Sequence, residues 1–223
     1  MRYLRLYQTL AEQTADKGNL VKPYVLYTKE NKTVTYTPQV IDFKDAITKQ
    51  WCVDNFDTDN DGELSYSEAK QVKELPNPST NKFPTDATSF DEFQYFTSVT
   101  SIADHTFYQC TSLSSITIPN SVTTIGHYVF QDCSSLSSIT IPDSVTTIGN
   151  SAFRMCSGLT SVIIGSSVKE LGYQTFSGCM SITTFKFNGP MDQWRGVLKG
   201  YDWHYGFPST TVVTCTDGTV PLD

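Results

Sequence analysis

Hydrophobic residues recur every 23 positions through the second half of the chain. Three consecutive segments align without gaps: LSSITIPNSVTTIGHYVFQDCSS from Leu113, LSSITIPDSVTTIGNSAFRMCSG from Leu136 and LTSVIIGSSVKELGYQTFSGCMS from Leu159. A partial copy precedes them from Val99, and a closing segment, ITTFKFNG, follows from Ile182. Self-similarity at a fixed period of this length indicates a stack of coils, with one coil per copy.

Seven columns of this alignment stay in phase from copy to copy. They consist of Leu113, Leu136, Leu159 and Ile182; Ile116, Ile139, Val162 and Phe185; Ile118, Ile141, Ile164 and Phe187; Val99, Val122, Val145 and Val168; Ile102, Ile125, Ile148 and Leu171; Phe107, Phe130, Phe153 and Phe176; and Cys110, Cys133, Cys156 and Cys179. One coil cannot bury such positions alone. The columns therefore predict continuous internal ladders in a solenoid of about four coils over residues 99–187.

The cysteine column needs a small, buried, apolar side chain. Neighbouring side chains in one ladder run parallel, which is a poor arrangement for a disulfide. We therefore expect these four thiols to be reduced. Cys52 and Cys215 lie too far apart in sequence for a pairing to be argued.

Each copy begins with a segment in which apolar and polar residues alternate, which predicts a short strand with one face outward. The outward side chains are small and mostly uncharged, and they form a candidate ligand-binding face. Its members are Ser115, Ser138, Ser161 and Thr184 in one row, and Thr117, Thr140, Ile163 and Lys186 in the other. Serine and threonine also simply solvate a sheet, so Ile163 and Lys186 are the distinctive members.

Residues 57–68, DTDNDGELSYSE, follow a different pattern. The spacing D-x-D-x-D-G with Glu at the twelfth place is that of an EF-hand calcium loop. The alternative is an acidic surface turn without an ion. As a calcium site, the loop would use side chains of Asp57, Asp59 and Asp61, the Glu63 carbonyl, Ser65 through a water, and both oxygens of Glu68.

The flanks of this loop predict a helix on each side. Apolar stripes at helical spacing precede and follow it, at Phe43, Ile47 and Trp51, and at Ala69, Val72 and Leu75. Calcium sensors usually pair two such loops, whereas this chain has one. We therefore expect a single structural ion with an affinity of roughly 10⁻⁵ to 10⁻³ M.

Both ends of a solenoid expose apolar columns unless they are capped. Ser89 and Glu92 have the spacing of a capping box, which predicts a capping helix, SFDEFQYF, at the first end. At the other end, Pro190 in the first turn predicts a short helix, MDQWRGVL, and TTVVTCT predicts a final strand. The aromatic run Tyr201–Phe207 fits either a cover for the last coil or a sugar-stacking platform.

These patterns divide an α+β chain into five parts. They are an N-terminal helix and hairpin segment (1–40), an EF-hand-like helix-loop-helix (41–76), a linker with the capping helix (77–98), the solenoid (99–187) and a C-terminal cap (188–223). In the first part, residues 2–15 suggest an amphipathic helix and residues 22–38 a hairpin that turns at 30–32.

Charge and composition narrow the classes of partner. Of the net charge of −7, residues 42–74 hold nine acids and four lysines, whereas 99–187 are nearly neutral. Without a basic patch, nucleic-acid binding is not expected. The sequence has no run of 18 apolar residues, so a transmembrane helix is not predicted. The N-terminus, MRYLRLYQTLAEQ, does not have the pattern of a signal peptide.

The sequence predicts no catalytic site. His105, His127 and His204 have no acidic or nucleophilic companion at a useful spacing, and we expect His105 and His127 to be exposed polar residues. Nucleophile-elbow, phosphate-loop, dinucleotide and zinc-protease motifs do not occur. The chain therefore does not have the pattern of an enzyme.

The motif ITIPxSVTTIGxxxFxxCxxL resembles the BspA-type leucine-rich repeats of bacterial surface proteins, over roughly residues 90–220. The resemblance implies a leucine-rich-repeat solenoid with an adhesin-like role, which binds a protein or glycan at the cell surface or outside the cell. The missing signal pattern leaves a cytoplasmic location open. Two other functions also stay open: a structural module of an appendage or phage-derived fibre assembled through residues 1–40, and a calcium-responsive regulator.

Overall fold

The computed structural model describes residues 25–27, 34–36 and 39–222, and the chain divides into two compact units, Met1–Val40 and Ile41–Asp223. In the first unit, strand β1 (Val25–Tyr27) pairs antiparallel with β2 (Val34–Tyr36). The predicted helix at 2–15 and the predicted turn at 30–32 lie outside the described residues.

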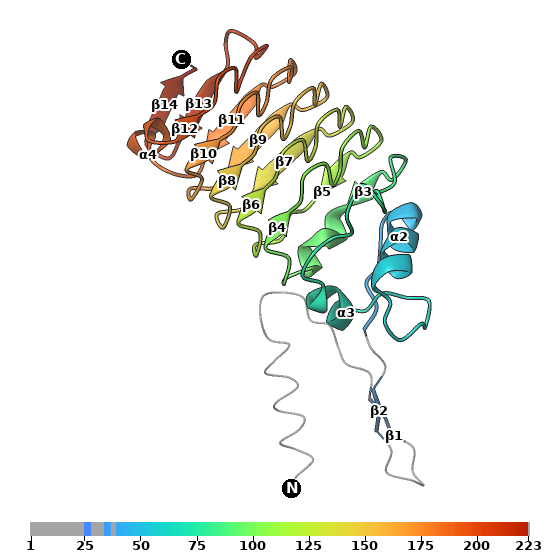
Figure 1. The fold of residues 1–223 in the computed structure, drawn as a ribbon. Coiled ribbons are helices and arrows are strands. Elements are labelled where there is room, and N and C mark those ends of the chain that lie inside the picture. The colour runs from blue at the N-terminus through green and yellow to red at the C-terminus, as the bar shows by residue number, and fades with distance from the viewer. Residues whose placement is uncertain (1–24, 28–33, 37–38, 223) are drawn as a thin grey trace, which may run out of the picture. The chain divides into compact units, whose positions relative to one another are not determined.

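The second unit is a stack of coils with two sheets that run along it (Figure 1). The long-strand sheet contains β7 (Ser138–Ile141), β9 (Ser161–Ile164), β11 (Thr184–Phe187), β13 (Val212–Cys215) and β14 (Gly218–Pro221). Its strands are parallel except β14, which closes the C-terminal edge antiparallel to β13. These strands are the alternating segments, so the predicted solenoid of about four coils is confirmed.

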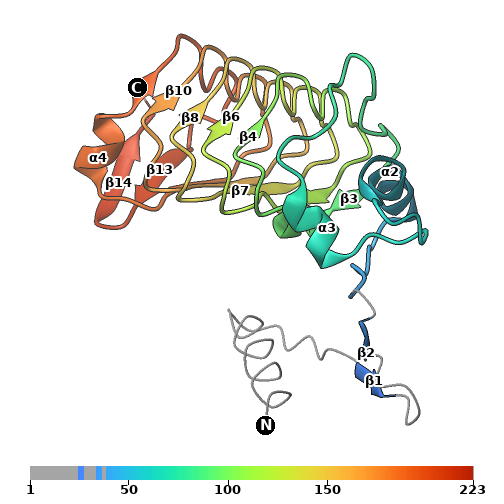
Figure 2. The ribbon, with the colours of Figure 1, turned by 60° about the horizontal axis from the view of Figure 1, so that its bottom comes forward.

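A second sheet was not predicted. The short-strand sheet contains β4 (Ser101–Ile102), β6 (Thr124–Ile125), β8 (Thr147–Ile148), β10 (Glu170–Leu171) and β12 (Leu198–Lys199), all parallel. Each of its strands has two residues, too few to produce an alternating pattern in the sequence. The two sheets lie on different sides of the stack (Figure 2). Among the described strands, none pairs with the N-terminal side of β4, which is therefore called the free edge of the short-strand sheet.

The predicted C-terminal cap contains a further coil. Strand β12 pairs with β10, and the amides of Gln174, Phe176 and Gly178 donate to carbonyls in residues 201–205. Helix α4 (Met191–Arg195) is inserted before β12, so the spacing from β10 to β12 is 28 residues rather than 23. The insertion removed this coil from the 23-residue alignment. Residues 196–198, which the sequence placed in the helix, lie outside it because the chain turns there into β12 and joins the sheet.

The core consists of the predicted ladders. The ring centroids of Phe107, Phe130, Phe153 and Phe176 follow one another at 5.0–5.1 Å with nearly parallel planes. All four cysteines of the column are buried and free, as predicted. The thiols of Cys133, Cys156 and Cys179 donate to the phenylalanine carbonyl of the preceding coil at 3.0–3.1 Å.

The predicted capping helix at Ser89–Phe96 is wrong. Ser89 lies in β3 (Ser89–Phe90), which pairs with β5 (Ser115–Ile116), and only a 3-10 turn, η1 (Asp91–Tyr95), follows. The Glu92 carboxylate accepts from the Lys44 amide instead of capping Ser89. Pairing with a distant strand has overridden the local capping signal.

Helix α2 (Ala46–Phe56) covers this end of the stack instead (Figure 1). The Thr48 hydroxyl donates to the Ser89 carbonyl at 2.7 Å, and the Trp51 ring packs edge-on against Phe83 and Phe90. The buried face of α2 is formed by Thr48, Trp51 and Cys52, whereas Ile47 of the predicted stripe is 39% exposed.

We predict that Phe130→Ala lowers the free energy of unfolding by about 3–5 kcal/mol, because it opens a cavity in a continuous ring stack. Tyr128→Ala serves as the control, because Tyr128 lies two residues away and its side chain is exposed. It is expected to lower the free energy of unfolding by less than about 1 kcal/mol. Denaturant unfolding measures both. A loss below about 1 kcal/mol for Phe130→Ala would contradict an internal stack.

We also predict that native protein at pH 8 resists alkylation at the buried thiols. Burial raises the pKa of Cys110 to about 12 and raises the pKa values of Cys133 and Cys156, so little reactive thiolate forms. Iodoacetamide labelling followed by peptide mass spectrometry should modify these cysteines only after unfolding in guanidinium. Modification of Cys156 in the folded protein would contradict the buried ladder.

Candidate functional site

The acidic loop is a tight turn built on its own carboxylates. The Asp57 carboxylate accepts from the amides of Asn60 (2.7 Å) and Gly62 (2.9 Å). Asn60 and Gly62 have φ of 58° and 84°, so the second position suits glycine, as the sequence pattern required. This folding brings ligand oxygens of Asp57, Asp59 and Asp61 within 4.8 Å of one another.

The three carboxylates repel one another electrostatically. Partial loss of solvent and the nearby charges of Asp61, Glu68 and Asp57 raise the pKa of Asp59, although the Asp61 amide donates to it. Oxygen atoms gathered in this way are the ligands that calcium prefers. The arrangement can therefore hold a hard cation.

Glu68 is not gathered with the three aspartates. One of its oxygens accepts from the amide and hydroxyl of Thr58, and the other from those of Ser65, at 2.7–2.9 Å. Ser65 and Glu68 form a reciprocal capping box at the start of helix α3 (Tyr66–Gln71). Glu68 would have to exchange some of these bonds to reach an ion beside Asp57. The Glu63 side chain pairs with Lys49 of α2.

The bonds to Glu68 also shift its titration. Burial by itself would raise the pKa of Glu68, but the donors from Ser65 and Thr58 lower it from 4.5 to about 2. A depressed pKa in the folded state means that this carboxylate stabilises the fold above about pH 4.5. That contribution is lost as the pH falls towards 2.

Loop and solenoid belong to the same compact unit. The Asp45 carboxylate at the start of α2 accepts from Thr88 (amide and hydroxyl) and from the Thr48 amide. Leu64, inside the loop, accepts a backbone bond from Ile41 at 2.8 Å. The loop is thus bonded to Ile41 on one side and is continuous with α2, the helix that covers the first coil, on the other.

The predicted ligand face lies on the outward side of the long-strand sheet. Ser138, Ser161 and Thr184 are aligned across β7, β9 and β11. A second row aligns Thr140, Ile163 and Lys186. Lys186 is exposed and Ile163 half-exposed. The sequence alignment missed the next position of this row, Thr214 of β13, because the insertion before the last coil shifts its spacing.

Ser115 and Thr117 do not continue these rows by strand pairing. Strand β5 pairs with β3, and the hydroxyls of both residues donate to the Asp91 carboxylate at 3.2 and 3.4 Å. Asp91 also forms an ion pair with Lys44 at 2.7 Å. This end of the face is therefore charged, which the repeat pattern did not indicate.

The corner beside the short-strand sheet carries the histidines. His127 Nδ1 accepts from the Asn150 amide, and the His127 amide donates to Asp104, each at 2.7–2.8 Å. His105 is exposed and stacks on Tyr128 with centroids 4.9 Å apart. Both histidines are exposed as predicted, but each also makes a contact at the corner, His127 through a hydrogen bond to the next coil and His105 through stacking on Tyr128.

The aromatic run Tyr201–Phe207 covers the last coil with only part of its side chains. Trp203 is buried against Phe185 and Trp194. Tyr201 and Tyr205 are 75% and 66% exposed. The cover interpretation therefore holds for Trp203, while the two tyrosines face solvent.

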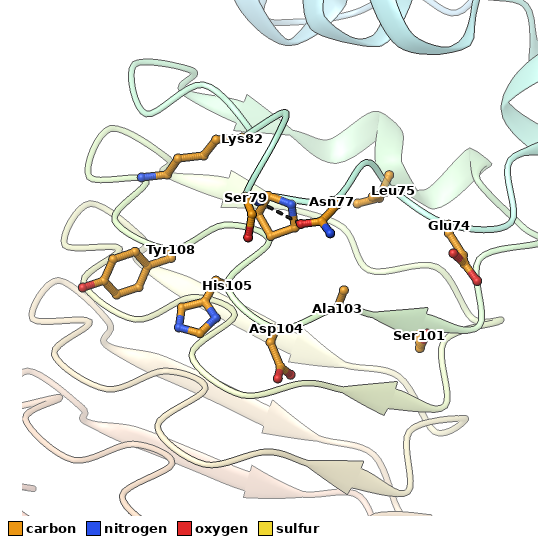
Figure 3. Close-up of a pocket in the computed structure, with 11 residues that line it drawn as sticks. Glu74, Leu75, Asn77, Ser79, Lys82, Ser101, Ala103, Asp104, His105 and Tyr108 are labelled. Atoms are coloured by element: carbon orange, nitrogen blue, oxygen red, sulfur yellow. Dashed lines mark hydrogen bonds between the residues drawn. The ribbon is translucent and has the colours of Figure 1, made fainter.

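A groove of about 760 Å³ lies where the linker 74–82 passes the first coil (Figure 3). Its linker wall includes Glu74 and Lys82, and its coil wall includes Asp104, His105 and Tyr108. Lys82 Nζ lies 5.6 Å from the centre of the Tyr108 ring. The sequence analysis identified this segment only as the start of a linker (77–98), because the residues of the coil wall are distant in the chain.

Three solved structures are similar to parts of the chain. They are a leucine rich cell surface protein from Faecalibacterium prausnitzii (24% identity, TM-score 0.44, 53% of this chain and 37% of that chain), a leucine rich repeat protein of T. pallidum (29%, 0.37, 48% and 53%) and a leucine-rich repeat protein from Bacteroides ovatus (27%, 0.42, 56% and 32%). The chain thus spans from about a third to about half of their lengths. A comparison with curated proteins finds no match.

No helix in the described part of the chain is long and apolar enough to cross a membrane. Residues 80–195 match the family described as the BspA type leucine rich repeat region, in six copies. This match includes the repeats and the corners that the structure arranges into coils, and it covers just over half of the 223 residues. The chain therefore belongs to the BspA-type leucine-rich-repeat family.

Proposed function

We propose that the protein is a non-catalytic, adhesin-like binding protein, located at a bacterial cell surface or secreted, which recognises a protein or glycan ligand. The outward face of the long-strand sheet supports this proposal most directly. Its rows of hydroxyl groups repeat at the strand spacing of about 4.8 Å. Such a face matches a partner with regularly spaced polar groups.

Binding energy on a face of this kind concentrates in a few residues. Ile163 supplies an apolar contact and Lys186 a charge, and they are register neighbours on β9 and β11. A ligand that contacts both gains burial and an ion pair or charged hydrogen bond at one place. The surrounding serine and threonine hydroxyls then supply complementarity rather than most of the affinity.

We predict that replacing Ile163 and Lys186 together with Ser weakens ligand binding at least tenfold, or about 1.4 kcal/mol, without unfolding the protein. The ligand is first selected from an array of glycans and extracellular-matrix proteins, and its Kd is then measured by biolayer interferometry. Thr147→Ser with Lys169→Ser makes the same charge change beside the other sheet and should leave the Kd unchanged. Equal affinity of both double variants would place the site elsewhere.

We also propose that the acidic loop holds one structural calcium ion. Asp57, Asp59 and Asp61 are close enough to share an ion. The Glu63 carbonyl, Ser65 and Glu68 would supply the other oxygens of the pattern, Glu68 after it exchanges some of its bonds to Thr58 and Ser65. Because α2 runs from the cover of the first coil into this loop, an ion bound there would stabilise the N-terminal end of the solenoid.

We predict that calcium raises the Tm of the native protein and that chelator reverses the rise, because the ion binds the folded state only. Asp59→Asn should abolish the rise. In chelator this variant should be at least as stable as the native protein, since it removes one repelling charge and keeps an acceptor for the Asp61 amide.

Asp54→Asn is the matched control for this experiment. Asp54 is an exposed carboxylate on α2, three residues before the loop and outside the aspartate cluster. It should retain the full calcium response in differential scanning calorimetry. A native Tm that is indifferent to both calcium and chelator would contradict the calcium site and leave the ligand face untouched.

A further inference from the structure

Some backbone groups of the first coil have no hydrogen-bond partner among the described residues, although the equivalent groups of every later coil bond to the coil before it. In later coils, the amides at the position of Thr100 (Thr123, Thr146 and Lys169) donate to the preceding coil at 2.8 Å. The amides at the position of Ala103 (Gly126, Gly149, Gly172 and Gly200) do the same at 2.8–2.9 Å. Within the described part of the chain, the Thr100 and Ala103 amides have no such partner.

The corner that follows has the opposite polarity. There each coil donates forward, so that the carbonyls of His127 and Gln131 accept from the first coil at 2.9–3.0 Å. The equivalent carbonyls of the first coil belong to Asp104 and Tyr108, and neither accepts a bond from the described residues. Along the first coil, the two donors are thus followed by two acceptors, and Ala103, Asp104 and Tyr108 of this set line the groove.

Unpaired backbone amides at a sheet edge are a template for the addition of another strand. An extended polypeptide carries backbone carbonyls that can accept from such amides. The volume of about 760 Å³ is within the range of ligand sites, roughly 300–1,000 Å³. The edge of β4 is therefore available for pairing.

Ala103 excludes one kind of occupant. A Cβ at Gly126 would lie 2.9 Å from the Ile102 carbonyl oxygen and from the Asp104 nitrogen of the preceding coil, and Gly149 and Gly172 are equally confined. The first coil has alanine at this place. A further coil stacked in register, such as that of a second copy of the chain, would collide with the methyl group. A strand that pairs at β4 and then diverges avoids this collision.

The opposite wall of the groove is preformed. Asn77 closes a turn by accepting from the backbone amides of Ser79, Thr80 and Asn81 at 2.9–3.0 Å. The Asn81 carboxamide is in turn bonded to Trp51 of α2. A peptide that enters the groove meets a wall that needs no folding, which lowers the entropic cost of binding.

The side chains of the groove favour a basic residue in the occupant. Glu74 and Asp104 line the groove, and both are exposed. The Asp104 carboxylate points toward the next coil, where its Oδ1 accepts from the His127 amide (Figure 3), so its negative charge lies at the edge of the groove. Lys82, the one lysine or arginine among the described residues of the lining, lies near the Tyr108 ring at the other end (Figure 3).

We propose that an extended segment of a partner protein, with a lysine or arginine opposite Glu74 and Asp104, binds in this groove by adding a strand to the free edge of β4. This inference rests on the proposed binding function and assigns it a second surface. The Thr100 and Ala103 amides donate to the segment, which then diverges from the first coil before the corner.

The test uses the full chain and a phage-displayed library of random twelve-residue peptides. Selected peptides are synthesised, and their Kd is measured by fluorescence anisotropy. They should carry a basic residue, and their binding should protect the Thr100 and Ala103 amides from hydrogen exchange. If these amides are already protected in the free protein, a segment of this chain occupies the groove and the proposal is overturned.

Ala103→Phe fills the groove without touching the core and should weaken the selected peptides at least tenfold. Ala103→Gly keeps the amide and the space, and its Kd should stay within about twofold. Asp104→Asn keeps the acceptor for His127 and removes the charge, so it should weaken basic peptides. Asp143 accepts a similar bond from the Ser166 amide, far from the groove. Asp143→Asn preserves that bond and should leave the binding of basic peptides unchanged. Unchanged melting curves establish that each variant folds.

Two results would overturn the proposal. Recovery of no peptide above background excludes strand addition at this edge. If the peptides bind Ala103→Phe normally but lose affinity when Ile163 and Lys186 are replaced by Ser, they bind at the ligand face. That result would exclude the groove as their binding site. Failure of the inference is thereby separated from failure of the proposed binding function.

Discussion

The backbone hydrogen bonds between successive coils set the spacing on which the second unit depends. Each inner coil donates backwards along the sheets and forwards at the histidine corner, so it is bonded to the coil before it and to the coil after it. The phenylalanine rings follow the same repeat at 5.0–5.1 Å, a distance at which nearly parallel rings stay in contact. The thiol bonds of the cysteine column and the glycines of the corner are further consequences of this spacing.

The same constraint explains positions that look variable. Asp104, His127 and Asn150 occupy one column, and each accepts from the amide of the next coil at 2.7–2.8 Å. A carboxylate, an imidazole and a carboxamide meet the requirement equally, since only an acceptor at one place is needed. Chemical variety in this column therefore coexists with a single structural role.

A stack held together in this way has unpaired backbone groups and exposed core side chains at its first and last coils. The two ends of this solenoid are covered in different ways. At the C-terminal end, β14 turns back on β13 and closes the long-strand sheet. At the N-terminal end, α2 and the phenylalanines of residues 83–96 cover the core, while the edge of β4 stays open beside the linker. The acidic loop, the cover and the groove are consequently neighbours in one unit, and the ligand face runs along the side of the stack.

The sequence by itself determined the period, the internal ladders, the outward rows of the strands and the grouping of Asp57, Asp59 and Asp61. These follow from local spacing: an apolar column must face inward in every coil, and a twelve-residue loop folds on its own atoms. The tertiary structure alone decided the features that depend on distant partners. Ser89 pairs with Ser115 instead of capping a helix, Glu68 turns to Thr58 and Ser65, and a 28-residue step hides the last coil. The free edge of β4 is likewise invisible in the sequence, because it is defined by a neighbouring strand that is missing rather than by any residue that is present.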